Sequence, residues 1–326
     1  MGRRDVKPLQ RQSLIIAMFL FGLSLAASGQ STPPDRLGPG DHRLTLKAGG
    51  LERRYLVHIP LRSDGKSPMP VVIMLHGGGG TAETARTSTG WVVKADEAGF
   101  IVAFPEATRP DPSRPASFLS NPPIWNDGSG RGHAGRGNVD DTGFIGSMIE
   151  DLIARFLVDE KRIYVTGFSN GASMAFRAGV ELSGRIAAVA PVSGILWRND
   201  VKLERPVPML YIIGTLDPFN PLEGGDVKTP WGRTEKKPPI RESILAWAKM
   251  LDCTLEPKVV CDRDGVKALS YGPGKGGAVV LFYTIEGMGH AWPGGKQVLS
   301  EKIAGKGSDK VKAVDQIWDF FKGRSR

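Results

Sequence analysis

Hydrophobic positions near the start of the folded part of the chain alternate with polar ones, which is typical of half-buried strands. The segments 41–48 (DHRLTLKA) and 52–60 (ERRYLVHIP) both alternate in this way and are separated by two glycines. They predict an antiparallel strand pair joined by a tight turn. The next two apolar segments, 70–75 (PVVIML) and 99–105 (GFIVAFP), are continuous instead. Continuous apolar runs of this length indicate strands that are buried on both faces of a sheet.

Segments with helical periodicity alternate with the later apolar runs. The clearest is 142–157, where apolar residues recur every three or four positions, as in a helix with one buried face. By the same criteria we expect further helices at 91–98, 170–182, 240–251 and 310–323, and further buried strands at 162–167, 185–194, 207–214 and 277–287. Strands that alternate with helices form a mostly parallel sheet covered on both faces. The pattern therefore predicts a doubly wound α/β domain with an antiparallel N-terminal strand pair.

Residues 105–140 interrupt this alternation. The segment is rich in Pro and Gly and has little periodicity, and loops of this length in a compact domain are usually lids or binding loops, or else disordered. It leaves the carboxyl end of a predicted strand, where open α/β sheets bind their ligands. We therefore expect this loop to form a wall of the active site.

The first 29 residues have the features of an export signal. The basic stretch MGRRDVKPLQRQ is followed by an apolar run and by small residues at Ala27 and Gly29. This predicts a cleaved signal peptide at 1–29 and a single catalytic domain at 30–326. The alternative is an uncleaved anchor helix, for which the apolar run is short. We expect a secreted or periplasmic protein whose mature form has no membrane span.

The charge of the chain does not indicate a nucleic-acid partner. The net charge is +9, and removal of residues 1–29 leaves +6. The remaining basic residues are scattered and form no stripe interleaved with aromatic residues, so binding to nucleic acid is not expected. The sequence leaves the oligomeric state open.

Two cysteines, Cys253 and Cys261, lie eight positions apart in one polar segment. In an exported protein this spacing predicts a local disulfide. Two free thiols are the alternative.

The motif GFSNG places Ser169 between two glycines, directly after one predicted strand and before a predicted helix. This is the strand–turn–helix context of a nucleophile elbow, in which the triad follows the chain order Ser, then Asp or Glu, then His. Of the five histidines only His290 follows Ser169, and it lies in a Gly-rich loop after the last predicted strand. Asp217 directly follows a strongly apolar strand, although an Asp before Pro also forms turns. We expect Ser169, Asp217 and His290 to be the catalytic residues.

Backbone donors for an oxyanion are expected on two segments. One is the amide of Asn170, the residue after the candidate nucleophile, and the other lies in HGGGG at 76–80. Gly78 is the first candidate in that loop and Gly77 the second. HGGGG lacks the G-K-[ST] ending of a phosphate-binding loop, and we expect His76 to brace it. The dispersed histidines and the absence of H-E-x-x-H and C-x-x-C predict neither a metal site nor a cofactor.

Several stretches together resemble the extracellular polyhydroxybutyrate depolymerase-like and feruloyl-esterase-like branch of the α/β-hydrolases. The stretches are VVIMLHGGGG, GFIVAFPEA, IWNDG, VDDTGFIGSMIEDL, KRIYVTGFSNGASMAFR, APVSG, IIGTLDPFNP and IEGMGHAWPGG. The resemblance implies a serine esterase that uses Ser169, Asp217 and His290. It also implies that Trp125 and Trp292 bind substrate. Packing in the core is the alternative role for both.

The expected reaction is hydrolysis of a carboxylic ester through an acyl-enzyme. We expect no appended polymer-binding module in this sequence, which favours soluble 3-hydroxybutyrate oligomers or small hydroxycinnamoyl, aryl and alkyl esters over a solid polyester. Two other readings stay open at this point. The same triad could transfer the acyl group to an envelope alcohol, or the scaffold could serve as a non-catalytic binding protein.

Overall fold

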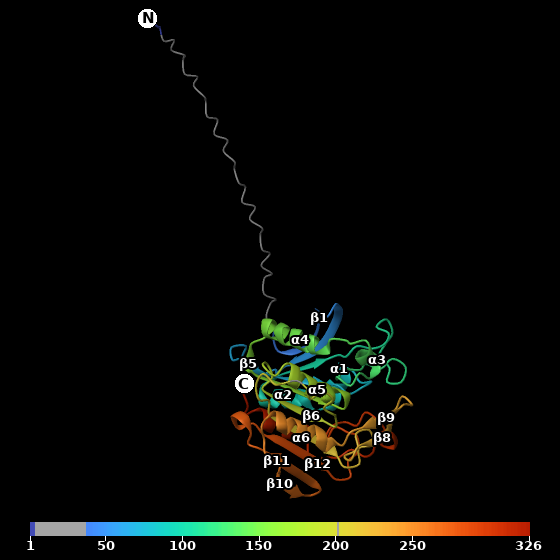
Figure 1. Cartoon of the computed structure of the whole chain (residues 1–326). Coiled ribbons are helices and arrows are strands. Elements are labelled where there is room, and N and C mark those ends of the chain that lie inside the picture. Colours follow the sequence, from blue (N-terminus) through green and yellow to red (C-terminus); the bar gives the residue numbers. More distant parts are fainter. Residues whose placement is uncertain (4–36, 201) are drawn as a thin grey trace. The chain divides into compact units, whose positions relative to one another are not determined.

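The computed structural model describes residues 1–3, 37–200 and 202–326. The chain divides into two units, Met1–Pro33 and Pro34–Arg326, and the second contains the helices and strands described below (Figure 1). The predicted signal peptide at 1–29 lies outside the described residues, apart from its first three positions.

The second unit is built on a large mixed sheet. Its strands are β1 (Gly40–Ala48), β2 (Leu51–Ile59), β3 (Met69–Leu75), β4 (Ile101–Pro105), β5 (Val158–Phe168), β6 (Ala188–Val192), β7 (Met209–Gly214), β10 (Lys258–Arg263), β11 (Val266–Tyr271) and β12 (Val280–Ile285). They are arranged in the order β1-β2-β4-β3-β5-β6-β7-β12-β11-β10. Strands β4 to β12 in this order are mutually parallel, and antiparallel strands flank them at both edges.

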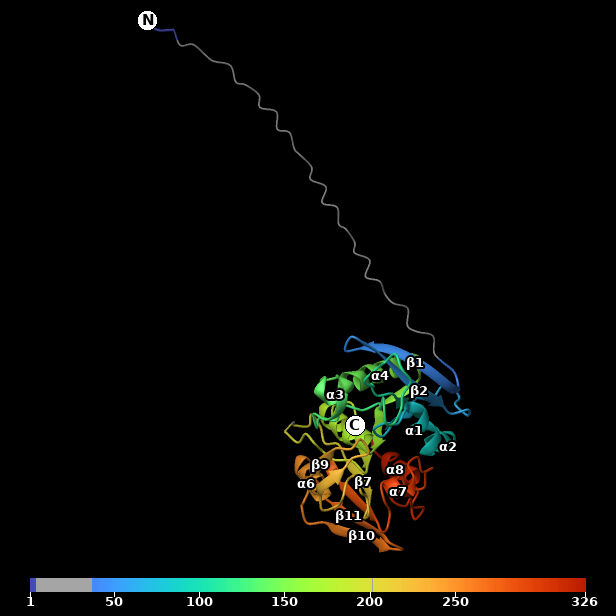
Figure 2. The same cartoon turned by 90° about the vertical axis from the view of Figure 1, so that its right-hand side faces the viewer.

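Helices cover both faces of this sheet (Figure 2). Those of the described residues are α1 (Ala82–Ser88), α2 (Trp91–Ala98), α3 (Gly132–Arg136), α4 (Asp141–Arg155), α5 (Asn170–Glu181), α6 (Ile240–Met250), α7 (Glu301–Ala304) and α8 (Ala313–Phe321), with a short 3₁₀ turn at Lys275–Gly277. Helices α4, α5 and α6 pack on one face, and α1, α2 and α8 pack on the other. In the part of the chain described here, no helix combines the length and the apolar character that a bilayer crossing needs.

Alternate residues of the buried strands contribute to two separate cores. On β3, Val71, Ile73 and Leu75 pack in the core that contains α4, α5 and α6, whereas Val72 and Met74 pack in the core that contains α1, α2 and α8. All five side chains are at most 1% exposed. Because successive side chains of a strand point to opposite faces, a strand covered on both sides must be apolar throughout, as the run at 70–75 is.

The predicted doubly wound, mostly parallel sheet with an antiparallel N-terminal strand pair is confirmed. The sequence pattern did not predict β10 and β11, which extend the other edge of the sheet. It also missed a separate hairpin formed by β8 (Gly225–Lys228) and β9 (Thr234–Lys237). Strands β8, β9 and β10 carry mostly exposed residues, so they lack the continuous apolar runs that mark the central strands. Strand β11 does alternate, with Val266, Ala268 and Tyr271 buried, and the sequence pattern missed it.

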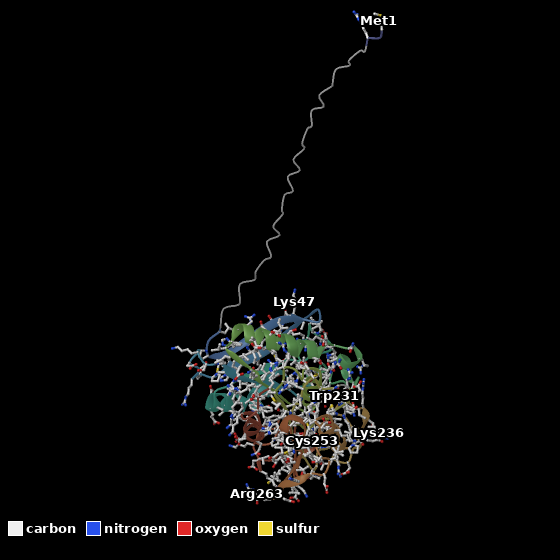
Figure 3. All side chains as sticks on the ribbon, turned by 60° about the vertical axis from the view of Figure 1, so that its left-hand side comes forward. Met1, Lys47, Trp231, Lys236, Cys253 and Arg263 are labelled. Atoms are coloured by element: carbon white, nitrogen blue, oxygen red, sulfur yellow. The ribbon has the colours of Figure 1, made fainter. Side chains whose placement is uncertain are left out.

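The predicted disulfide is wrong, because Cys253 and Cys261 are free thiols in the structure. Cys253 is buried behind the end of α6, where its amide donates to the carbonyl of Ala248 and its sulfur lies 3.6 Å from the carbonyl oxygen of Ala278. Cys261 lies in the edge strand β10, which ends at Arg263 (Figure 3). An extended strand advances about 3.3 Å per residue, so β10 carries Cys261 away from α6 instead of folding it back onto Cys253.

Parallel strands bring several segments to one edge of the sheet. Their carboxyl ends all point the same way, and five of them are followed by segments with candidate site residues. These are 76–80 after β3, 105–140 after β4, Ser169 after β5, the Asp217 segment after β7 and the His290 segment after β12. The topology therefore gathers residues that are up to 214 positions apart in the chain.

Candidate active site

Ser169 lies on a strained turn between β5 and α5. Its backbone has φ 56° and ψ −120°, a region that residues with a Cβ adopt only when the surrounding structure holds them there. A Cβ on Gly167 would lie 2.3 Å from the carbonyl oxygen of Gly171, and a Cβ on Gly171 would lie 2.3 Å from those of Leu75 and His76. The two glycines of the motif are therefore required by close backbone approaches, and the turn presents the serine at the edge of the sheet.

The HGGGG loop packs directly against this turn. A Cβ on Gly77 would lie 3.4 Å from the Cβ of Ser169, and a Cβ on Gly78 would lie 3.5 Å from the Cβ of Asn170. Within the described ranges the backbone amides of Gly77, Gly78 and Asn170 donate to no protein acceptor, whereas that of Gly79 is bonded to the carbonyl of Pro123 at 2.7 Å. These unbonded amides lie close to Ser169 and are available to a ligand that carries an acceptor.

His76 braces the HGGGG loop and is held neutral. Its Nε2 accepts from the amide of Ala107 at 3.0 Å, so Nδ1 carries the proton and donates to the carbonyl of Gly77 at 2.8 Å. Burial lowers the pKa of His76 to about 4, and the hydrogen bond with Gly77 opposes this shift in part. The imidazole thus connects the HGGGG loop to the start of the 105–140 loop without taking up a proton near neutral pH.

The lowered pKa of His76 predicts a specific loss of stability in acid. Unfolded chains protonate histidine below about pH 6.5, but folded chains do so only near pH 4, so stability is complete above pH 6.5 and falls as the pH drops between these values. At pH 4.5 this histidine alone should lower the free energy of unfolding by about 2 kcal/mol relative to pH 7. Urea unfolding of wild type and His76→Gln at both pH values measures the difference. An equal pH dependence in the two proteins would contradict the assignment.

Asp217 and His290 are joined by a buried hydrogen bond. The distance from His290 Nδ1 to Asp217 Oδ2 is 2.8 Å, and the two side chains are 3% and 0% exposed respectively. The other carboxylate oxygen, Oδ1, accepts from the amides of Phe219 and Asn220 at 2.9 Å each. Since the carboxylate holds the proton of Nδ1, Nε2 of His290 is left to act as a base.

Ser169 and His290 line the same cavity, which has a volume of about 680 Å³. Two aromatic rings hold the imidazole: Phe168 lies with its centroid 4.7 Å from that of His290, and Phe219 meets it edge-on at 5.0 Å. Over the described residues no hydrogen bond joins the Ser169 hydroxyl to His290. Such contacts often become short only when substrate is bound, and the arrangement brings both groups to one solvent-connected space.

The cavity has one expected wall and one that the sequence pattern missed. The 105–140 loop lines it, as predicted, with residues that include Phe118 and Ile124. The opposite wall comes from the β8–β9 hairpin, whose Trp231 donates from Nε1 to the carbonyl of Phe118 at 2.7 Å and packs its ring 5.4 Å from that of Phe118. A tryptophan in the polar segment TPWGRTEKK was the only signal in the sequence for this second wall.

The predicted substrate-binding role of Trp125 is not supported by its position. Trp125 is fully buried and is absent from the described lining of the cavity. Its indole Nε1 donates to the carbonyl of His76 at 2.9 Å, and its backbone amide donates to Asn170 Oδ1 at 2.8 Å. It therefore packs beneath the site and positions the HGGGG loop and Asn170. Trp292 does line the cavity, and its Nε1 is bonded to the carbonyl of Thr89 at 3.1 Å.

Two neighbouring carboxylates at the start of α4 have structural roles. Asp140 caps the helix, because its Oδ1 accepts from the amide of Gly143 at 2.8 Å. Asp141 is buried in an ion pair with Arg53 at 2.6 Å and accepts from the amide of Asn126 at 2.7 Å. Burial raises the pKa of Asp141, and the Arg53 charge opposes this effect. These bonds fix the end of the 105–140 loop to the start of α4 and to β2.

The chain is similar to known esterases. Residues 54–202 match the family model described as esterase PHB depolymerase. The chain is 32% identical over 249 residues to feruloyl esterase B of Piromyces equi. This alignment covers 75% of this chain and 44% of that protein. It is 26% identical over 324 residues to NocK of Nocardia uniformis subsp. tsuyamanensis, named as an inferred esterase, with 92% and 89% coverage.

The fold has also been seen before. The acetyl xylan esterase from Aspergillus awamori superimposes with a TM-score of 0.55 at 16% identity, over 77% of this chain and 94% of that one. This likeness concerns the fold alone, and the chain spans less than half the length of feruloyl esterase B. The family model and the sequence relatives, taken without this structural likeness, show that the chain belongs to the polyhydroxybutyrate depolymerase-like and feruloyl-esterase-like family of α/β-hydrolases, a family of carboxylic-ester hydrolases.

Proposed function

We propose that the protein is a serine esterase that cleaves carboxylic esters through an acyl-enzyme formed on Ser169. The observation that carries this proposal is the arrangement at one edge of the sheet. A serine on a strained turn lines the same cavity as an imidazole, and a buried carboxylate holds that imidazole at 2.8 Å. Each group alone has an ordinary structural explanation, but together they match the roles of nucleophile, base and orienting acid.

The reaction follows from these positions. Ser169 Oγ attacks the ester carbonyl while His290 Nε2 takes its proton, and Asp217 stabilises the resulting imidazolium. The amide of Asn170 and that of Gly78, with Gly77 as the second candidate, bind the negative oxygen of the tetrahedral intermediate. The alcohol leaves with the proton from His290, and water then attacks the acyl-enzyme with the same base. The acid is released and Ser169 is regenerated.

The cavity favours small or soluble esters as substrates. A volume of about 680 Å³ lies within the range typical of pockets for small molecules. Aromatic rings of Phe118, Phe219 and Trp231 line it, and such rings suit the hydrocarbon part of an acyl group. We propose 3-hydroxybutyrate oligomers and hydroxycinnamoyl esters as the two substrate classes to compare.

Covalent labelling tests the mechanism directly. An alkyl 4-nitrophenyl phosphonate should attach once per chain, and mass spectrometry of the digested protein should locate the adduct on Ser169. Ser325→Ala, which removes an exposed serine near the C-terminus, serves as the matched control and should be labelled as fast as wild type. Ester hydrolysis by a protein labelled at another residue, or not labelled at all, would refute the proposed nucleophile.

We also propose that the protein is exported and that residues 1–29 are removed. The support is the basic and apolar composition of this segment. Sequencing of the N-terminus after cell fractionation tests the proposal. A mature chain in the periplasm or medium that begins close to residue 30 is the expected result, and an intact N-terminus in the cytoplasmic fraction would contradict it.

A further inference from the structure

The described lining of the candidate active-site cavity is rich in positively charged side chains. Among the described residues that line it, the cations outnumber the carboxylates, with Arg131, Arg136, Arg233, Lys237 and Lys296 against Asp127 and Glu235. Arg136, Arg233 and Lys296 are exposed, and within the described ranges none of the three makes an ion pair. Neutral esters need no such surroundings, so the charge calls for an explanation beyond the triad.

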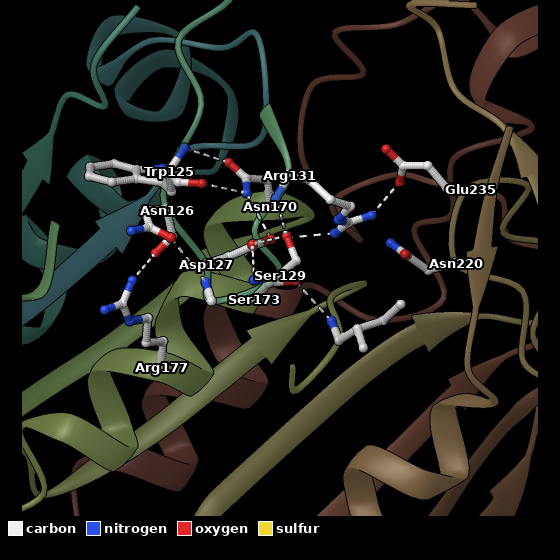
Figure 4. Close-up of polar contacts among 12 residues, drawn as sticks. Trp125, Asn126, Asp127, Ser129, Arg131, Asn170, Ser173, Arg177, Asn220 and Glu235 are labelled. Carbon is white, nitrogen blue, oxygen red and sulfur yellow. Dashed lines mark hydrogen bonds and ion pairs between the residues drawn. The ribbon is translucent and has the colours of Figure 1, made fainter. Parts of the chain in front are cut away.

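Two of the cations, Arg131 and Lys237, are held together inside the cavity. Arg131 places its guanidinium carbon 4.3 Å from the centre of the Trp197 ring, and Lys237 places its ammonium 5.6 Å from the same ring. Both also pair with Glu235, which lies at 2.9 Å from Lys237 Nζ. Figure 4 shows Arg131 extending toward Glu235 on the facing strand. Glu235 thus contacts both cations, and Lys237 has no second carboxylate within ion-pair distance in the described part of the chain.

The other nearby carboxylate is already occupied. Asp127 accepts from the Asn170 side chain at 3.0 Å and from the Ser129 hydroxyl at 2.5 Å. Its distance to Arg131 Nη2 is longer, at 3.5 Å. Asp127 therefore links Arg131 to the residue next to the candidate nucleophile, and its oxygens are already engaged by these neighbours (Figure 4).

Both cations keep donors without an acceptor. The Nε–H of Arg131 is buried and has no hydrogen-bond partner within the described residues. The side chain of Lys237 is 8% exposed, and its ammonium has three donors but pairs with Glu235 alone in the described part of the chain. Burial, and then the Arg131 charge, lower the pKa of Lys237, while Glu235 opposes the shift. A ligand carboxylate at this position would accept from the free donors of the Lys237 ammonium.

We propose that Arg131 and Lys237 form a carboxylate-binding subsite, and that the preferred substrates are esters that carry a second, free carboxylate. Oligomers of hydroxy acids with an unesterified acid end belong to this class. The planar guanidinium suits a carboxylate, and the partly buried site strengthens the attraction relative to water. This inference rests on the proposed esterase function, since the subsite acts on substrates of Ser169.

A pair of substrates that differ only in charge tests the proposal. The dimer and trimer of 3-hydroxybutyrate are compared as free acids and as terminal carboxamides, with kcat/KM measured for each. Wild type should prefer the free acid of at least one length by about tenfold or more, and added salt should reduce this preference. Lys237→Gln should bring the ratio close to one. Lys47→Gln, on β1 at an edge of the sheet, is the matched control and should keep the wild-type ratio.

The outcomes separate this inference from the proposed function. Efficient Ser169-dependent hydrolysis of the carboxamides, with no preference for the free acids at either length, would overturn the subsite and leave the esterase intact. An undiminished preference in Lys237→Gln would overturn it as well. If wild type cleaved none of these esters or simple aryl esters, both proposals would fall. Should Lys237→Gln not fold, competitive inhibition of wild type by 3-hydroxybutyrate must exceed that by 3-hydroxybutyramide, and equal inhibition would refute the subsite.

Discussion

Replacement of Ser169 by Ala is expected to lower kcat for ester hydrolysis by at least about 10⁴-fold, because the substitution removes the oxygen on which we propose that the acyl-enzyme forms. The fold should be unaffected. Alanine keeps a Cβ at the same strained φ of 56°, and within the described residues the Ser169 side chain makes no hydrogen bond that the variant would lose.

This prediction is checked by steady-state kinetics on an aryl ester together with circular dichroism and thermal unfolding. Ser325→Ala is the matched control, since it removes an exposed hydroxyl far along the chain, and it should retain wild-type rates. A folded Ser169→Ala protein that hydrolyses esters at more than a few percent of the wild-type rate would rule out this serine as the nucleophile.

Replacement of Asp217 by Asn is expected to lower kcat by about 10³- to 10⁴-fold, and the structure gives a specific reason. Oδ1 of Asp217 accepts from the amides of Phe219 and Asn220, so the oxygen of an asparagine must occupy that position. The NH₂ group then faces His290 Nδ1, which has to accept instead of donate. The proton moves to Nε2, and the imidazole can no longer take a proton from Ser169.

The matched control for this change is Asp309→Asn, which alters an exposed carboxylate by the same one atom. It should leave kcat unchanged, while Asp217→Asn should keep KM within a few-fold of wild type because the carboxylate does not line the cavity. Nitrogen chemical shifts of the His290 ring report the tautomer. Wild-type activity in Asp217→Asn, or an unchanged tautomer, would show that another group orients the histidine.

The sequence alone was enough to predict the central strands of the sheet and the chain order of the candidate site residues. Continuous apolar runs such as 70–75 predict buried strands because a strand covered on both faces has no position for a polar side chain. Once the strands are parallel, the residues that follow them must lie at one edge. The order of Ser169, Asp217 and His290 along the chain therefore predicts that the three residues share this edge.

The sequence pattern did not determine the positions of Trp125 and the two cysteines. An indole in a Pro- and Gly-rich loop is equally compatible with lining a cavity and with packing beneath it, and only the hydrogen bonds of Trp125 to His76 and Asn170 distinguish the two. Likewise, a spacing of eight residues permits a disulfide between Cys253 and Cys261, but it does not reveal that the intervening chain becomes an extended edge strand.

The second wall of the cavity is the clearest example of a feature that the sequence pattern could not predict. Trp231, Glu235 and Lys237 lie in a short polar hairpin whose sequence has no periodicity to detect. The hairpin contributes to the site because its side chains meet Phe118 and Arg131, more than 100 positions earlier in the chain. Local patterns determine which segments become strands and helices, since those depend on neighbouring residues. Which polar side chains share one cavity depends on long-range packing, and only the tertiary structure decided it.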